Sequence, residues 1–182
     1  MGRQNKTVVQ KGPTPKKSVK SGVRPAISDR PLSFNLANGK WLKSINNKSF
    51  TNKLHKENDF APAIFELFNK VIPTVQSHWE EIFRNPGRSQ WKHCHTIDND
   101  KIDKVLAIVE TIHGHTYRES QTGSKLWQFG ISQGLRLVGI YNYNDNTVTP
   151  LFVDYHHLVY PSQKHNKEDH SSFKFCPYCA YK

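Results

Sequence analysis

Four residues in the second half of the chain have the side chains that RNA cleavage requires. Attack by a ribose 2′-hydroxyl needs a base to take its proton, an acid for the leaving oxygen and a cation to stabilise the phosphorane. Histidine suits both proton-transfer roles because its pKa lies near neutral pH. The sequence therefore suggests a metal-independent catalytic set. Its candidates are Arg136, His156, His157 and Tyr160.

Arg136 lies within the otherwise apolar run Leu135–Tyr141, where a buried and unpaired guanidinium would be costly. It must pair with a carboxylate, for which Asp154 and Glu119 are the candidates, or face a groove that holds an anion. The planar fork of five donors suits a phosphate group. Both interpretations remain open, as does a surface role for the two adjacent histidines.

The C-terminal sequence Cys-Pro-Tyr-Cys suggests a second chemistry. Two thiolates at the spacing of Cys176 and Cys179 can bind one tetrahedral zinc ion, and His165 and His170 are the nearest further ligands in sequence. The triplet at residues 93–95 could be brought near by folding. A structural zinc ion would fix a polar segment that has little apolar surface of its own. A redox dithiol is the alternative, although such pairs usually occur in a thioredoxin-like βαβ unit.

The charge distribution indicates a polyanionic partner. The chain of 182 residues has a formal net charge of +11, and residues 1–30, with eight Lys or Arg and one Asp, contribute +7. This segment cannot bury enough apolar surface to order itself. We predict a basic flexible arm that is either simply solvated or associated with nucleic acid or the ribosome. The predicted nucleic-acid contacts are Lys16, Lys17, Lys20, Arg24 and Lys125.

Composition argues against several classes of protein. No stretch approaches the roughly 18 consecutive apolar residues of a membrane span. The first residues are basic but lack the apolar segment of a secretory signal. Three cysteines, two of them in one Cys-x-x-Cys, do not make a disulfide framework. We therefore expect a cytoplasmic protein with no membrane partner.

Strands and helices must position these candidates. Residues 126–131, 135–141 and 147–153 have strand-like patterns separated by turn residues, and they predict an antiparallel meander. Apolar stripes predict a helix from residue 59 that Pro73 ends, a second over 74–84 and a third over 100–113.

Helices followed by a meander indicate an α+β domain, which we place at residues 31–162, with a polar C-terminal segment at 163–182. We expect the helices to cover one face of a small, twisted antiparallel sheet. The other face would then be partly open to an anionic ligand.

The meander resembles the core of the RelE/ParE-like toxins. The resemblance covers about 40 residues and is carried by Gln133–Tyr141 (QGLRLVGIY), the strand Thr147–Val153 and the terminal Val159-Tyr160. It implies an mRNA-cleaving toxin that acts on the ribosome and has a partner antitoxin. Arg136 matches the sheet arginine that stabilises the cleaved phosphate, and Tyr160 matches a tyrosine that stacks on a base and has been cast as general base.

Two departures qualify that resemblance. Trp127 and Phe129 stand where the family often has two lysines, and His156 and His157 stand near its second arginine. The function that we expect is RNA binding with metal-independent cleavage. A non-enzymatic module that binds nucleic acid or protein on the same sheet is the alternative.

Overall fold

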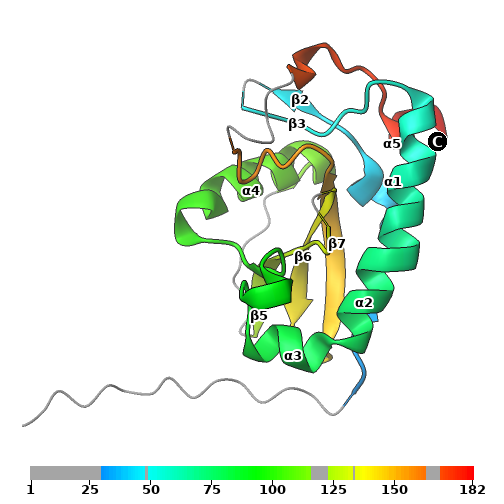
Figure 1. The fold of residues 1–182 in the computed structure, drawn as a ribbon. Helices are drawn as coiled ribbons and strands as arrows, with labels where there is room; N and C mark the ends of the chain where they lie inside the picture. Colours follow the sequence, from blue (N-terminus) through cyan, green and yellow to red (C-terminus); the bar gives the residue numbers. More distant parts are fainter. Residues whose placement is uncertain (1–29, 48, 116–122, 133, 163–168) are drawn as a thin grey trace, which may run out of the picture.

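The computed structural model describes residues 30–182, except for residues 48, 116–122, 133 and 163–168. This part of the chain has an α+β fold built on a five-stranded sheet with the order β1-β7-β6-β5-β4 (Figure 1). Its strands are β1 (Ser33–Phe34), β4 (His95–Thr96), β5 (Ser124–Phe129), β6 (Arg136–Asn142) and β7 (Thr147–Asp154). A separate two-stranded sheet pairs β2 (Asn46–Asn47) with β3 (Phe50–Thr51).

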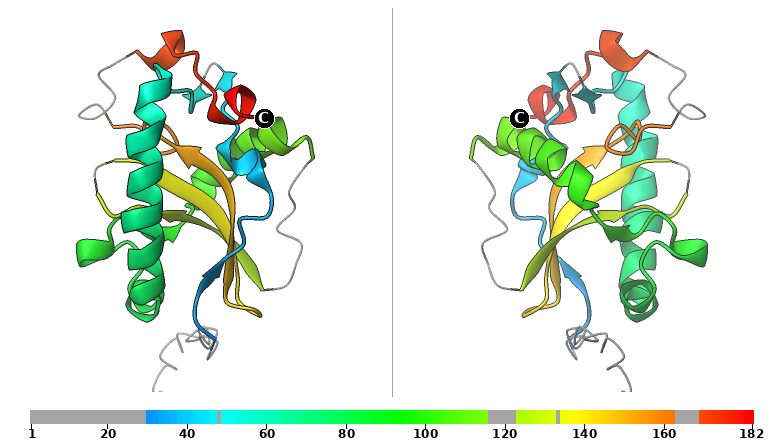
Figure 2. Two further views of the ribbon diagram at one scale, coloured as in Figure 1. Left: turned by 90° about the vertical axis from the view of Figure 1, so that its right-hand side faces the viewer. Right: turned by 90° about the vertical axis from the view of Figure 1, so that its left-hand side faces the viewer.

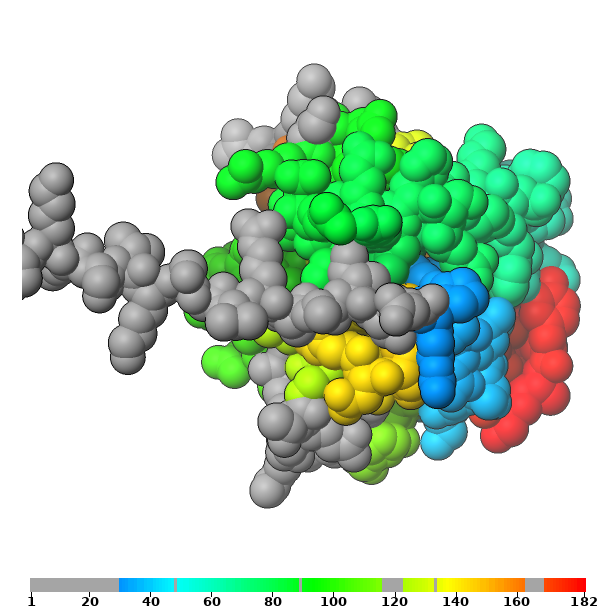
Figure 3. All heavy atoms as spheres, turned by 90° about the horizontal axis from the view of Figure 1, so that it is seen from below, coloured from blue at the N-terminus to red at the C-terminus, as the bar shows by residue number. Residues whose placement is uncertain are grey.

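The predicted meander is confirmed, because β5, β6 and β7 pair antiparallel in sequence order. The register shifts between Val138 and Gly139, where a Cβ on Gly139 would lie 2.9 Å from the Thr149 carbonyl oxygen. Only glycine allows the strands to approach so closely. The strand β1 pairs parallel with β7, so the sheet is mixed rather than antiparallel throughout. In Figure 3 the blue residues near the start of the described chain lie beside the gold residues of the meander.

The helical elements before and after the meander are short except for one. The α-helices are α1 (Phe60–Glu66), α2 (Ile72–Ser77), α3 (Trp79–Arg84), α4 (Asn99–His113) and α5 (Pro177–Ala180). A π-helical segment, η3 (Leu67–Val71), joins α1 to α2. Single 3-10 turns are η1 (Gly39–Leu42), η2 (Glu57–Asp59), η4 (Ser89–Trp91) and η5 (His170–Ser172). The predicted helix over 100–113 is confirmed, and Gly114 ends it in the left-handed conformation at φ 79°.

The prediction that Pro73 ends the first helix is wrong. The helical run continues from α1 through η3 into α2 and breaks at His78. In η3 the Ile72 N–H donates to the carbonyl of Leu67, five residues earlier, which is the π-helical pattern. Because the hydrogen bonds change register just before Pro73, its missing N–H comes at the start of a new α-helical segment, where proline is tolerated.

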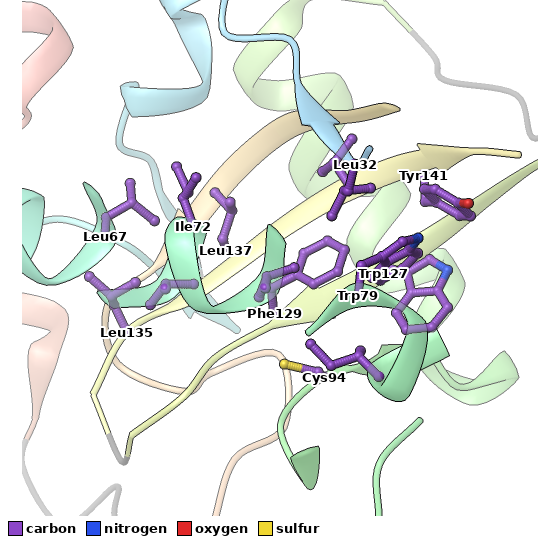
Figure 4. Close-up of a cluster of buried hydrophobic side chains, with 14 of the residues drawn as sticks. Leu32, Leu67, Ile72, Trp79, Cys94, Trp127, Phe129, Leu135, Leu137 and Tyr141 are labelled. Carbon is purple, nitrogen blue, oxygen red and sulfur yellow. The ribbon is translucent and has the colours of Figure 1, made fainter. Parts of the chain in front are cut away.

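Helices cover both faces of the sheet, so the expectation of one open face is also wrong. Figure 2 shows the α1–α2 run on one side and α4 on the other. On the first side Trp79 packs against Trp127 and Tyr141, with ring centroids 5.2 and 4.6 Å apart (Figure 4). On the second side α4 buries Val105 and Val109 together with other apolar residues of the sheet. These are Leu126, Val138, Ile140, Leu151 and Phe152.

Residues 169–182 are the part of the C-terminal segment that the structure describes. They pack against the residues between η1 and the start of α1. Phe175 pairs with Leu54 through backbone hydrogen bonds in both directions, each 3.0 Å. The Tyr181 hydroxyl donates to a Glu57 carboxylate oxygen at 2.7 Å, and its ring stacks on Phe60. These contacts pack the segment against residues 54–60. Within the described ranges, no helix is both long and apolar enough to cross a membrane.

Candidate functional site

A pocket of about 240 Å³ opens where the end of β5, the start of β6, the edge strand β4 and the loop after β7 meet. None of the described residues that line it carries a carboxylate, so its charge is neutral to positive. The lining residues are Lys92, His93, His95, Gln128, Arg136, His157, Tyr160 and Ser162. Arg136, His157 and Tyr160 thus come together as the sequence predicts, whereas His156 does not join them.

The guanidinium of Arg136 is fixed inside the fold. Only 2% of the residue is exposed, and its Nη1 donates to the carbonyl oxygens of Ser132, Gly134 and Leu135 at 2.8–3.0 Å. Burial lowers the pKa of Arg136 to about 10, against the opposing charge of Asp154. The side chain therefore remains positive at neutral pH. Asp154 is directly opposite in the β6–β7 register, while Glu119 lies outside the described residues.

The buried Asp154 shapes the loop that supplies two pocket residues. Its carboxylate accepts hydrogen bonds from the N–H groups of His156 (3.2 Å), Leu158 (3.0 Å) and Val159 (2.8 Å). The chain turns tightly around this carboxylate, and His157 takes the left-handed conformation at φ 57°. Such a conformation is uncommon for a non-glycine residue and persists when surrounding contacts fix it. The turn sends His157 to the pocket and His156 away from it.

His156 is part of a different cluster. Its Nε2 lies 2.7 Å from the Lys53 carbonyl oxygen, and its ring stacks on His170 with centroids 4.1 Å apart. It lies outside the residues that line the pocket. This arrangement gives His156 a structural contact with the segment after β3 rather than a place beside Arg136.

His93 is the pocket residue that sequence reasoning did not assign to this chemistry. The pKa of His93 is lowered to about 4, chiefly by burial and to a smaller extent by the charges of Arg136, Lys92, His157 and His95. Its Nε2 is buried and has no hydrogen-bond partner among the described residues. The imidazole is therefore neutral at pH 7, which is the form that a general base must have before it accepts a proton.

The alternation in the triplet His93-Cys94-His95 was the available signal. Extended residues two apart share a face, but His93 lies in the turn before β4 and only His95 is in the strand. The turn brings both imidazoles to the pocket, while Cys94 faces the core. Cys94 is fully buried, and its thiol donates to the Gly130 carbonyl at 3.3 Å. Burial raises the pKa of Cys94 to about 11, which makes it an inert core thiol.

Tyr160 packs edge-on against His95, with ring centroids 5.3 Å apart. Its hydroxyl oxygen accepts the Asp98 N–H at 2.9 Å, and the Asp98 side chain also interacts with the phenol and raises its pKa. Burial raises the pKa of Tyr160 to about 12, so the phenol keeps its proton at neutral pH. The structure favours Tyr160 as a proton donor over the role of base that the toxin resemblance implies.

The other predicted sites are not assembled in the described part of the chain. Those residues contain no group of three or more His, Cys, Asp or Glu side chains that could hold a metal ion. His170 lies against His156, and His165 is outside the described residues. Of the predicted nucleic-acid contacts, Lys125 is exposed at the start of β5, away from the residues that line the pocket. The remaining four, Lys16, Lys17, Lys20 and Arg24, lie outside the described residues.

The lowered pKa of His93 should make the fold less stable in mild acid. The unfolded chain binds a proton on this residue below about pH 6.5, but the folded chain does so only near pH 4, so stability falls across that interval. Between pH 7 and 4.5 the free energy of unfolding should fall by roughly 1–2 kcal/mol less in His93→Gln than in the wild type. This figure is smaller than the full pKa difference would give, because His93 is only partly buried and solvent weakens the effect. Urea unfolding of both proteins at the two pH values measures it. An equal acid loss in both proteins would contradict the placement of His93.

The fold and the pocket define an α+β protein with a basic, histidine-lined pocket. The family described as "Uncharacterised protein UU032" matches residues 37–182, so the chain belongs to that family. A relative of that name from Ureaplasma parvum serovar 3 is 29% identical over 170 residues, which span 92% of this chain and 91% of the relative. No solved structure matches the chain.

These comparisons overturn the resemblance to RelE/ParE-like toxins. The family that matches is UU032, and no RelE/ParE family matches. The resemblance depended on a short strand-turn-strand pattern, which many antiparallel sheets share. The expectation of a toxin with a partner antitoxin depended on it alone and falls with it.

Proposed function

We propose that this protein binds single-stranded RNA and cleaves it in the pocket around Arg136. One observation carries the proposal: a buried arginine and three imidazoles converge in a pocket whose described lining has no carboxylate. Such a site attracts an anion and supplies groups for proton transfer. RNA in the cytoplasm is the substrate class that fits both properties and the net charge of +11.

The phosphate would bind beside Arg136. The three carbonyl contacts use Nη1 and fix the plane of the guanidinium before any ligand arrives. Its other N–H groups can then contact phosphate oxygens without a further loss of side-chain entropy. Lys92, exposed at the rim of the pocket, adds a second positive charge.

The histidines and the tyrosine would carry the protons. His93, neutral at pH 7, accepts the proton of the ribose 2′-hydroxyl, and that oxygen attacks the neighbouring phosphorus. The bond from phosphorus to the 5′-oxygen breaks as Tyr160 donates its proton to that oxygen. The products are a 2′,3′-cyclic phosphate and a 5′-hydroxyl end. The reaction requires RNA because DNA has no 2′-hydroxyl.

Two adjacent histidines provide a matched test. The full-length protein, His157→Gln and His156→Gln are incubated with a 5′-labelled single-stranded RNA, and the products are separated and tested for a cyclic phosphate. We expect His157→Gln to slow cleavage by about tenfold or more, since it removes one of the imidazoles that line the pocket with Arg136. His156→Gln should stay within about threefold of the wild type because it lies outside the pocket.

Equal losses in both variants would contradict a site at the pocket. No cleavage by the wild type would overturn the enzymatic proposal and leave the alternative, a module that binds nucleic acid without cutting it. The salt dependence of RNA affinity identifies that module, because each phosphate contact contributes to the slope of log affinity against log salt. Removal of residues 1–30, which contribute +7, should then reduce the slope.

A further inference from the structure

The two C-terminal cysteines, Cys176 and Cys179, lie outside the pocket and are joined by a hydrogen bond from the Cys179 N–H to the Cys176 sulfur. The Cys176 sulfur accepts the backbone N–H groups of Ser44 and Cys179, each at 3.3 Å. Cys176 is 8% exposed, whereas Cys179 is exposed at the surface. One sulfur is therefore surrounded by donors, and the other is accessible to a reagent.

The hydrogen bonds give the two thiols different acidities. Burial alone would raise the pKa of Cys176, but bonds from the Cys179 side chain and the Ser44 and Cys179 N–H groups bring it below the usual value. The pKa of Cys179 is raised because its thiol donates to Cys176. The inner sulfur of Cys176 therefore loses its proton more readily than the outer sulfur of Cys179.

We propose that Cys176 and Cys179 form a thiol–disulfide exchange site for low-molecular-weight thiols and their disulfides. The pairing of a donor-supported inner sulfur with an accessible outer sulfur is the geometry that such exchange needs. The described residues offer no third side chain that would turn the pair into a metal centre. This inference is independent of RNA cleavage, because the thiols do not line the pocket.

The exchange proceeds through the accessible sulfur. In the oxidised protein, an external thiolate attacks the Cys179 sulfur, the disulfide bond breaks, and the electron pair leaves on Cys176. Donors that stabilise the leaving thiolate speed this step. A second external thiolate then attacks the external sulfur of the mixed disulfide, and the Cys179 thiolate leaves and takes a proton. The protein gains two electrons, and two external thiols become one disulfide.

Because the hydrogen bonds stabilise the reduced form, the couple should be readily reduced. Cys94 provides an internal control in the same molecule. It is fully buried and its pKa is raised to about 11, so it should neither form a mixed disulfide nor react with an alkylating agent under native conditions.

The test equilibrates the full-length protein with buffers of reduced and oxidised glutathione. After alkylation and trypsin digestion, the peptide at residues 175–182 carries both cysteines, and its mass distinguishes the dithiol, the disulfide and a mixed disulfide. We expect the wild type to pass between dithiol and disulfide without an accumulated adduct. Cys176→Ser should accumulate glutathione on Cys179, because it lacks the second sulfur that releases it. Cys179→Ser should form an adduct at least about tenfold more slowly, since the remaining sulfur is buried.

Native alkylation of the wild type, which needs no substitution, should label Cys179 ahead of Cys94. A pair that stays a dithiol in excess oxidised glutathione would overturn the proposal, as would equal adducts on all three cysteines. A third experiment repeats the alkylation in the presence of zinc. Protection of both thiols by one zinc ion per chain would show a metal clip and overturn the exchange site.

Discussion

Replacement of Asp154 by asparagine should destabilise the fold by about 3 kcal/mol. The carboxylate is fully buried and accepts three backbone N–H groups from the loop that follows β7. An amide has one oxygen, so at least one of these donors would lose its acceptor or face an N–H₂ group. The positive charge of Arg136, directly opposite in the sheet, would also lose its compensating charge.

Urea unfolding at pH 7 measures this effect. Asp103→Asn is the control, because Asp103 is exposed on α4 and should change stability by no more than about 0.5 kcal/mol. The RNA reaction adds a second readout, since the turn around Asp154 brings His157 to the pocket. A stable Asp154→Asn protein with wild-type cleavage would show that the turn forms without the carboxylate, contrary to the hydrogen-bond pattern.

The elements that local patterns define were predictable from the sequence. The meander followed from three apolar runs separated by turn residues, and the helix that Gly114 ends followed from its apolar spacing. These signals depend on residues a few positions apart. The face of the sheet that each helix covers does not depend on such local signals. With the same apolar stripes, α1, α2 and α4 could all have packed on one face. Long-range packing placed them on both faces.

Only the part of the pocket that depends on local sequence patterns was predictable. Arg136 stood out because a charged residue in an apolar strand needs a partner. The choice between His156 and His157 was not accessible, since it depends on a turn around Asp154 that reverses neighbouring side chains. His93 was considered only as one of a triplet that folding could bring near the C-terminal cysteines, and no role in the pocket was predicted for it. Its position beside Arg136 depends on the pairing of β4 with β5, a contact that spans about thirty residues.

Substitution of Gly130 by alanine should slow RNA cleavage by about 100-fold while leaving every charge in the pocket unchanged. A Cβ at this position would lie 2.6 Å from Cδ and 2.8 Å from Nη1 of Arg136. Both distances are shorter than a van der Waals contact, so the side chain must move. When the side chain moves, the guanidinium loses its present contacts with the carbonyl oxygens of Ser132, Gly134 and Leu135. The group that we propose contacts the phosphate is then displaced.

Gly39→Ala is the matched control, because a Cβ there meets no atom within 4 Å. Thermal unfolding separates a displaced arginine from a damaged fold. We expect Gly130→Ala to remain folded, with a modest loss of stability from the strained contact. The RNA affinity and the rate of cleavage should both fall, because Arg136 binds the phosphate and also stabilises its transition state. A folded Gly130→Ala protein that cleaves RNA at the rate of Gly39→Ala would remove Arg136 from the reaction. The imidazoles and Tyr160 would then have to account for any cleavage by the pocket.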